Sequence, residues 1–158
     1  QDTDIFVSFD INPADSRFLL ASAKRTNDQL FAVDCISSDG GGFPRNVIVQ
    51  NGLALVAFGA ISMQEFVIKT SRNPANMLGL TTKGSLAIGN DADITIIDKS
   101  RHQPSMAVAA GKIIMQSGEI SGRSGTALVL QEGLDHVNAL GIRSQIIDRS
   151  ALYRRRVI

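Results

Sequence analysis

One acidic residue follows the kind of strand end at which α/β enzymes place their catalytic groups. Asp39 comes after the apolar run Leu30–Ser37, which has the pattern of a strand buried in a parallel sheet. In α/β barrels and open α/β sheets, catalytic groups gather at the C-terminal ends of the strands. Asp39 is therefore a candidate catalytic group, although an Asp-Gly pair that only forms a turn explains the same spacing.

The residues around Asp39 form a loop that a ligand could approach closely. Glycine lets the backbone come near a ligand and leaves N–H groups free to bind an oxyanion or a carboxylate. The loop has neither of the glycine spacings that bind nucleotide phosphates, so nucleotide binding is not predicted. The candidate substrate contacts in this loop are Ser38, Gly40, Gly41 and Gly42.

Other polar residues are weaker candidates. Asp91 and Asp93 resemble a paired-carboxylate site, but a turn and a strand start explain both. Asp10 follows the predicted first strand and so also lies at a C-terminal strand end. The two histidines, His102 and His136, are interpreted as a surface residue and a structural residue, so one copy of the chain cannot assemble a complete metal site.

The first 80 residues alternate strands and helices. Ile5–Phe9 is β-prone, Asn12 and Pro13 mark a helix start, and Leu30–Ser37 is the second strand, which together predict a parallel βαβ unit. Cys35 in that second strand is expected to be a buried, inert thiol, and a single cysteine allows no internal disulfide.

Two helices are predicted after the glycine-rich loop. Ser62 and Glu65 have the spacing of a capping box, which predicts a helix start. Asn73, Pro74 and Gly79 predict a second, short helix with Asn73 as its N-cap.

From Lys83 onward the pattern changes to short strands and tight turns. Ala110-Gly111-Lys112 is expected to form a hairpin turn, and the tail is expected to hold a helical turn over 135–140 and a strand over 143–148. The predicted domains are therefore an α/β part over 1–80, a small β domain over 81–130 and a tail over 131–158. The four expected strands of the β domain are Gly84–Ile88, Ala92–Ile97, Met106–Ala110 and Lys112–Met115.

Composition excludes several classes of function. The formal net charge is +1 and charged residues make up 20% of the chain, so no global field recruits nucleic acid or an acidic membrane. No run approaches the roughly 18 apolar residues of a membrane span, and a cytoplasmic location is the default expectation. The chain opens at Gln1, directly before a predicted strand, which is expected of a truncated or processed chain.

Two ordered motifs resemble those of the amidohydrolase superfamily. Ser37-Ser38-Asp39-Gly40-x-Gly42 is followed by Asn73-Pro74-Ala75-x-x-Leu78-Gly79-Leu80 and then by Lys83-Gly84-Ser85-Leu86 with Gly89 and Asp91-Ala92-Asp93. The Ser-Ser-Asp-Gly form is most similar to isoaspartyl dipeptidases, and next to D-aminoacylase and dihydropyrimidinase relatives. Phe43 departs from the small polar residue that those dipeptidases carry after the loop.

The resemblance implies a fold and a chemistry. The fold would be the C-terminal strand–helix units of a (β/α)8 TIM barrel followed by a small β-sandwich-like domain. Asp39 would bind a divalent metal, usually zinc, and act as general base in hydrolysis of a small-molecule amide substrate. The early His-x-His pair and later ligands of such a site are missing from this chain. Its partners would then be the remainder of its own barrel or further copies in a homo-oligomer.

Two other interpretations stay open. The chain is a non-catalytic fragment or a structural subunit that completes a barrel with a partner chain. Alternatively, it is an unrelated small α/β ligand-binding domain that shares the hairpin motif by chance.

Overall fold

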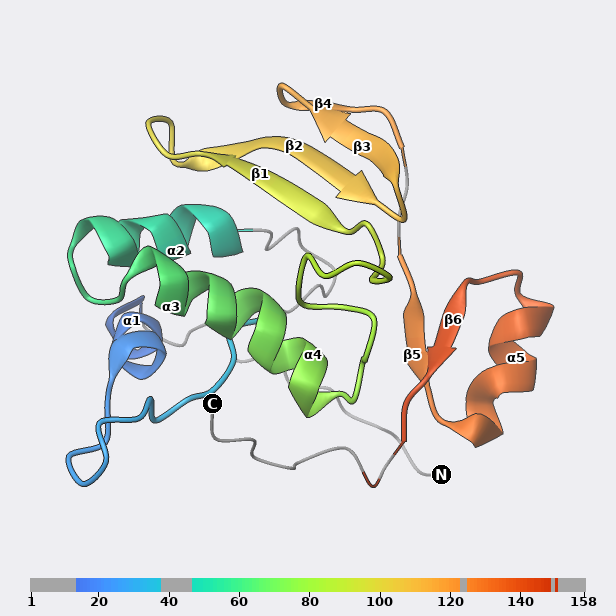
Figure 1. Cartoon of the computed structure of the whole chain (residues 1–158), viewed down its shortest axis with the longest axis horizontal. Coiled ribbons are helices and arrows are strands. Elements are labelled where there is room, and N and C mark those ends of the chain that lie inside the picture. The colour runs from blue at the N-terminus through green and yellow to red at the C-terminus, as the bar shows by residue number, and fades with distance from the viewer. Residues whose placement is uncertain (1–13, 38–46, 123–124, 149, 151–158) are drawn as a thin grey trace, which may run out of the picture. The chain divides into compact units, whose positions relative to one another are not determined.

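The computed structural model describes residues 14–37, 47–122, 125–148 and 150 (Figure 1). The chain divides into two compact units, Gln1–Asp34 and Cys35–Ile158. The described elements include both helices and strands, which confirms the mixed α/β class. None of the described helices has the length and apolarity needed to cross a membrane.

The first unit contains a helix followed by a tight turn. α1 runs over Ala14–Ser22, and the Ser22 hydroxyl donates to the carbonyl of Phe18 at 2.7 Å. Beyond the helix, Lys24 and Phe31 form an isolated antiparallel bridge, and the Lys24 ammonium lies 4.9 Å from the centre of the Phe31 ring. The predicted start of α1 at Asn12 and Pro13 lies outside the described residues.

The expected strand Leu30–Ser37 is wrong. Its residues are all described, yet only Phe31 pairs, and it pairs antiparallel with Lys24. A strand exists through a ladder of hydrogen bonds to a neighbouring strand, and this run forms a single bridge in place of a ladder. Cys35 is accordingly half-buried rather than buried. The first strand of the expected βαβ unit, Ile5–Phe9, lies outside the described residues.

The second unit begins with helices that hold its apolar core. α2 covers Ile48–Ala57, and one continuous helical stretch then contains α3 (Met63–Val67), the π-helical turn η1 (Ile68–Arg72) and α4 (Asn73–Met77). Gly52 of α2 makes room for the Phe66 ring, because a Cβ there would lie 2.0 Å from a ring carbon. The buried apolar residues of the described chain are Leu53, Leu55, Ile61, Phe66 and Ala75.

The capping box at the start of α3 is confirmed. The Glu65 N–H donates to the Ser62 hydroxyl at 3.1 Å, and the Ser62 N–H donates to the Glu65 carboxylate at 2.7 Å. Each bond satisfies a backbone donor that the first helical turn leaves without a partner. The sequence therefore identified this helix start correctly.

The predicted N-cap at Asn73 is wrong, because the helix does not restart there. Asn73 has helical dihedrals, and its N–H donates to the carbonyl of Ile68 five residues back. The wider π-turn also accommodates Pro74, whose ring would clash with the preceding turn of a regular α-helix. The helix ends at Met77 with Leu78 as its C-cap, and Gly79, the glycine expected at the helix end, follows with a φ of +68°.

Lys69 has a carbonyl that the helix itself cannot use. In the π pattern its partner would be residue 74, which is proline and has no N–H. The N–H of Ile36 takes that place and donates to the Lys69 carbonyl at 3.0 Å. The chain segment that leads to Ser37 is thereby tied to the π-turn.

A four-stranded antiparallel meander follows (yellow to orange in Figure 1). Its strands, in spatial and chain order, are β1 (Ile94–Asp98), β2 (Gln103–Ala109), β3 (Lys112–Gln116) and β4 (Glu119–Ile120). The predicted turn is confirmed: Ala110 and Gly111 have φ of +48° and +77°, as a two-residue hairpin loop of type I′ needs. The expected strand Gly84–Ile88 is wrong, because those residues form turns and bends.

The tail forms a small parallel pair. β5 (Ala127–Val129) is followed by η2 (Gln131–Gly133), α5 (Leu134–Ala139) and β6 (Ser144–Ile146), and β6 pairs parallel with β5. The expected helical turn is present one residue earlier than predicted, and the expected strand is present with shorter bounds. The domain bounds at residues 80 and 130 stay predictions, and the described residues do not form a barrel.

Candidate functional site

The predicted catalytic loop lies outside the described residues. This applies to Asp39, Ser38, Gly40, Gly41 and Gly42. The structure does describe the two residues directly before that loop. Ile36 is half-buried and its N–H is bonded to the Lys69 carbonyl, and Ser37 is exposed. The assignment of Asp39 as metal ligand and general base therefore stays a prediction.

The burial of Lys69, whose carbonyl is bonded to Ile36, was not predicted from the sequence. Its side chain is 1% exposed, and it is the one buried polar or charged residue within the described ranges. A lysine in an amphipathic helix is normally assigned to the solvated face, so periodicity gives no signal for its burial. The π-turn shifts the helical register by one residue and thereby changes which side chains face inward.

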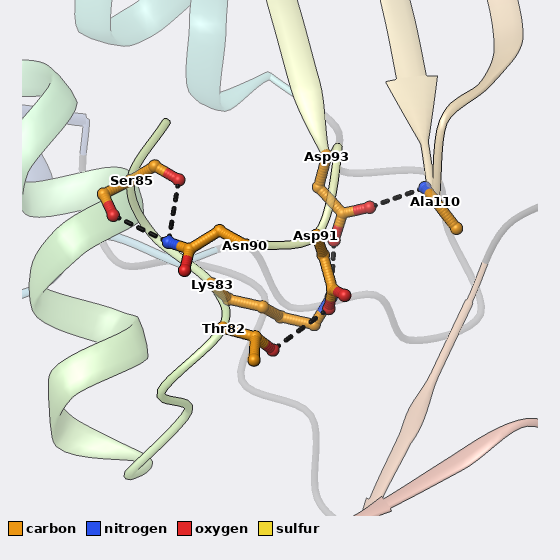
Figure 2. A network of polar contacts seen from close by, with 7 residues as sticks. All are labelled: Thr82, Lys83, Ser85, Asn90, Asp91, Asp93 and Ala110. Atoms are coloured by element: carbon orange, nitrogen blue, oxygen red, sulfur yellow. Dashed lines mark hydrogen bonds and ion pairs between the residues drawn. The ribbon is translucent and has the colours of Figure 1, made fainter. Parts of the chain in front are cut away.

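A second group of polar residues joins the loop after α4 to the β-hairpin (Figure 2). The Lys83 ammonium lies 2.8 Å from a carboxylate oxygen of Asp91 and 2.5 Å from one of Asp93. The other oxygen of Asp93 accepts the N–H of Ala110 at 2.8 Å, in the turn between β2 and β3. We call Lys83, Asp91 and Asp93 the lysine clasp.

Opposite charges shift the pKa values of the clasp. Hydrogen bonds to Asp91 and then Asp93 raise the pKa of Lys83 above its ordinary value. The bond from Lys83 is the main cause that lowers the pKa of Asp91 and of Asp93, and the Ala110 N–H lowers the pKa of Asp93 further. All three groups are therefore charged at neutral pH, which fits a structural ion-pair cluster better than an acid–base pair.

Short contacts fix both ends of residues 84–90, the segment that lies between the clasp residues Lys83 and Asp91. A Cβ on Gly84 would lie 2.7 Å from the Ala75 Cβ and 2.8 Å from the Ser71 carbonyl oxygen, so only glycine fits against the helix here. Asn90 donates to the Ser85 carbonyl at 3.1 Å and to its hydroxyl at 2.8 Å. The clasp thus positions β1 and the hairpin against the loop that follows α4.

The structure corrects the interpretation of the two aspartates in part. Turn chemistry was expected to explain them, and Asp91 does follow the turn at Ile88 and Gly89, but its N–H donates to the Thr82 carbonyl at 2.9 Å, nine residues earlier. Their main partner is nevertheless Lys83, eight and ten residues earlier in the chain. No local rule links residues at that separation, although all three belong to the motif that carries the resemblance.

The described residues do not provide a metal site. Within the described ranges, no group of three or more His, Cys, Asp or Glu side chains is placed to hold a metal ion. His102 is exposed before β2, as predicted, and His136 is exposed on α5. Asp10 lies outside the ranges for which the structure gives a position.

Comparison with known proteins gives a family. The model of the amidohydrolase family matches residues 20–125. Over 50 residues the chain is 48% identical to a dihydroorotase from Pelotomaculum thermopropionicum, and this stretch is 32% of the chain and 12% of that protein. The matched stretch is thus a small part of that relative's length.

Proposed function

Because the chain belongs to the amidohydrolase family, we propose that it is the C-terminal part of a metal-dependent hydrolase that cleaves a C–N amide bond. The family match over residues 20–125 is the observation that carries this proposal. The same match rules out the alternative of an unrelated ligand-binding domain. The dihydroorotase similarity supports amide hydrolysis, since that relative is named for an enzyme that acts on dihydroorotate.

The proposed architecture has three parts. Residues 1–80 complete a TIM barrel, residues 81–130 form the small β domain, and residues 131–158 are a tail. The meander β1–β4 lies within the second part and supports it. A whole barrel needs about 250 residues, so this chain of 158 residues would share its barrel with further sequence. That remainder is the proposed partner, in the same polypeptide or in another copy of a homo-oligomer.

Asp39 is the proposed general base. Its carboxylate would take a proton from the attacking water and return it to the leaving nitrogen, which a carboxylate near neutral pH can do when held within hydrogen-bond reach. Family members typically bind divalent metals, and zinc is the metal proposed here, with Asp39 as one ligand. The described residues do not supply the other ligands, so in this proposal those ligands come from sequence other than the described ranges.

The proposed substrate is a small molecule with a carboxylate near its scissile amide. Isoaspartyl dipeptides are the first candidate, on the Ser-Ser-Asp-Gly motif, and dihydroorotate is the second, on the 48% identity to a dihydroorotase. Both carry such a carboxylate. The backbone N–H groups of Gly40, Gly41 and Gly42, with the Ser38 hydroxyl, would bind it.

The test uses the full-length protein encoded by the gene, loaded with zinc and assayed against isoaspartyl dipeptides, N-acyl-D-amino acids, dihydropyrimidines and dihydroorotate. We expect hydrolysis of one class and a loss of roughly 100- to 10,000-fold in kcat for Asp39→Asn, the range typical of a lost general base. Asp34→Asn is the matched control, because Asp34 is exposed five residues earlier. Full activity in Asp39→Asn would remove Asp39 from the mechanism.

A non-catalytic role is the second candidate. It is favoured by the exposure of both histidines and by the lack of a ligand cluster among the described side chains. A structural subunit would bind no zinc alone, and it would restore hydrolysis when mixed with a chain that carries the remaining ligands. Stoichiometric zinc in the purified full-length protein, together with hydrolysis by it alone, would exclude this role.

A further inference from the structure

A cavity beside the β2–β3 hairpin has the size of a small-molecule site. Its volume is about 500 Å³, and small-molecule sites occupy roughly 300 to 1,000 Å³. Its lining comes from the hairpin, from the loop after β4 and from the residue before β6. We call it the hairpin pocket, and the residues that matter here are Ala110, Lys112, Ile113, Ile114, Ser121 and Arg143.

Two cationic side chains line the hairpin pocket. They belong to Lys112, the first residue of β3, and to Arg143. Among the described residues, neither cation forms an ion pair with a carboxylate. The pKa of Asp93 is lowered first by Lys83 and least by Arg143, and the Asp93 carboxylate is already bonded to Lys83. Two cations in one concave place produce a local positive potential, which attracts anions.

Backbone bonds hold the polar lining residues in place. Lys112 belongs to the ladder between β2 and β3. The N–H of Ser121 donates to the Ile114 carbonyl at 3.0 Å, and the Arg143 carbonyl accepts the N–H of Ala127 at 2.9 Å. All three polar side chains therefore start from ordered backbone, which lowers the entropy that is lost when a ligand binds.

The rest of the lining that concerns a ligand is apolar. Ala110, Ile113 and Ile114 contribute it, and Ile113 is 50% exposed. Covering apolar surface of this kind is favourable, and an inorganic anion would leave it in water. The pocket therefore suits an anion that carries an apolar group.

We propose that the hairpin pocket binds a small organic anion, with its carboxylate or phosphate held by Lys112, Arg143 and the Ser121 hydroxyl and its apolar part against Ile113. The arginine fork can donate two parallel hydrogen bonds to either head group. This inference goes beyond the proposed function and does not depend on it. Arg143 lies after residue 125, where the family match ends, so that match does not imply this site.

The test is a titration of the zinc-free full-length protein, followed by the NMR signals of its isoleucine and leucine methyl groups. The probes are phenyl phosphate, benzoate, inorganic phosphate and the neutral benzyl alcohol. Phenyl phosphate and benzoate should shift the Ile113 signal with a Kd of about 1 mM, which is ordinary for ligands of this size. Inorganic phosphate should bind roughly fivefold more weakly, or weaker still. The signals of Leu53 in the buried core should not move.

Two variants remove the cations one at a time. Lys112→Gln and Arg143→Gln should each raise the Kd for phenyl phosphate roughly fivefold or more, because each removes a charge-assisted hydrogen bond. Both side chains are exposed, so the variants should fold as the wild type does. Lys99→Gln is the matched control, since Lys99 is an exposed lysine in the turn after β1, and it should leave the Kd unchanged.

The outcomes separate a binding site from two solvated surface cations. Binding of either aromatic anion that both variants weaken, and that the control does not, supports the inference. The tighter of the two anions then identifies the head group. The inference is overturned if neither anion shifts the Ile113 signal, or if Lys99→Gln weakens binding as much as Lys112→Gln does. Equally tight binding of inorganic phosphate or of benzyl alcohol overturns the organic-anion class.

Discussion

The N–H of Ile36 donates to the carbonyl of Lys69 at 3.0 Å, and that carbonyl is available because residue 74 is a proline. The π-turn moves each helical bond one residue further along, as the bond from Asn73 to Ile68 shows. The acceptor at Lys69 would then need an N–H at position 74, which proline lacks. Pro74 therefore leaves the Lys69 carbonyl as the point at which the chain around Ile36 bonds to the helix.

Replacing this proline should loosen that attachment. In Pro74→Ala the new N–H competes for the Lys69 carbonyl within the helix. A backbone hydrogen bond contributes about 1 kcal/mol net, so we expect roughly fivefold faster amide exchange at Ile36, measured by hydrogen–deuterium exchange. Asn73→Ala, which keeps the proline, is the control. Equal protection of Ile36 in both variants would contradict this account of the π-turn.

Gly52 should tolerate no side chain. In Gly52→Ala the new Cβ would lie 2.0 Å from the Phe66 ring, which is itself 2% exposed and cannot move into solvent. Overpacking of this kind costs about 1 to 3 kcal/mol, seen as a lower midpoint of urea unfolding. Gly125→Ala is the matched control, because no atom lies within 4 Å of its added Cβ. Phe66→Leu combined with Gly52→Ala should recover part of the loss.

The capping box should stabilise α3 measurably. Ser62→Ala removes the acceptor of the Glu65 N–H and should lower the free energy of unfolding by about 1 kcal/mol. Ser62→Asp should retain most of the stability, because aspartate is also a good N-cap. Chemical denaturation of both variants provides the measurement, and equal stability of the two would argue against the cap.

The lysine clasp should make stability depend on pH at both extremes. The pKa values of Asp91 and Asp93 are lower in the folded protein than in the unfolded chain, so their contribution is present above the ordinary carboxyl pKa, near 4. That contribution is lost as the pH falls below about 4. The pKa of Lys83 is raised, so its contribution is present below its ordinary value near 10.4 and is lost at higher pH.

Removing the lysine tests this dependence. Lys83→Met should flatten the decline in thermal stability as the pH falls below about 4, relative to wild type. Because the two carboxylates are 35% and 41% exposed, the loss of stability at pH 7 should be small. Lys99→Met is the control, because Lys99 lies in the turn at the other end of β1 from Asp93. A decline as steep in Lys83→Met as in wild type would show that other groups control the acid transition.

Two local signals in the sequence were reliable because the contacts that stabilise them are local. The capping box at Ser62 and the turn at Ala110 and Gly111 depend on residues within a few positions, and both are present. α2 was missed because nothing marks its start: Val47 makes no side-chain cap, and the first turn has no acidic residue. Its apolar composition alone does not separate a helix from a strand.

Longer-range contacts could not be predicted from the sequence, for a different reason. The run Leu30–Ser37 has the composition of a buried strand, but a strand also needs a neighbour, which composition cannot supply. The partnership of Lys83 with two aspartates and the burial of Lys69 both depend on how separate segments meet. For the catalytic loop around Asp39, the family resemblance remains the main support.

The anchoring of residues 84–90 makes this stretch suitable for engineering. Gly84 is fixed against the helix, Asn90 is bonded back to Ser85, and between them the side chains of Leu86 and Ile88 are exposed. Lengthening a loop whose ends are already held costs little conformational entropy, because closure depends only weakly on loop length. A peptide tag or a fluorophore site introduced between Leu86 and Ile88 should therefore report on the protein without disturbing its fold.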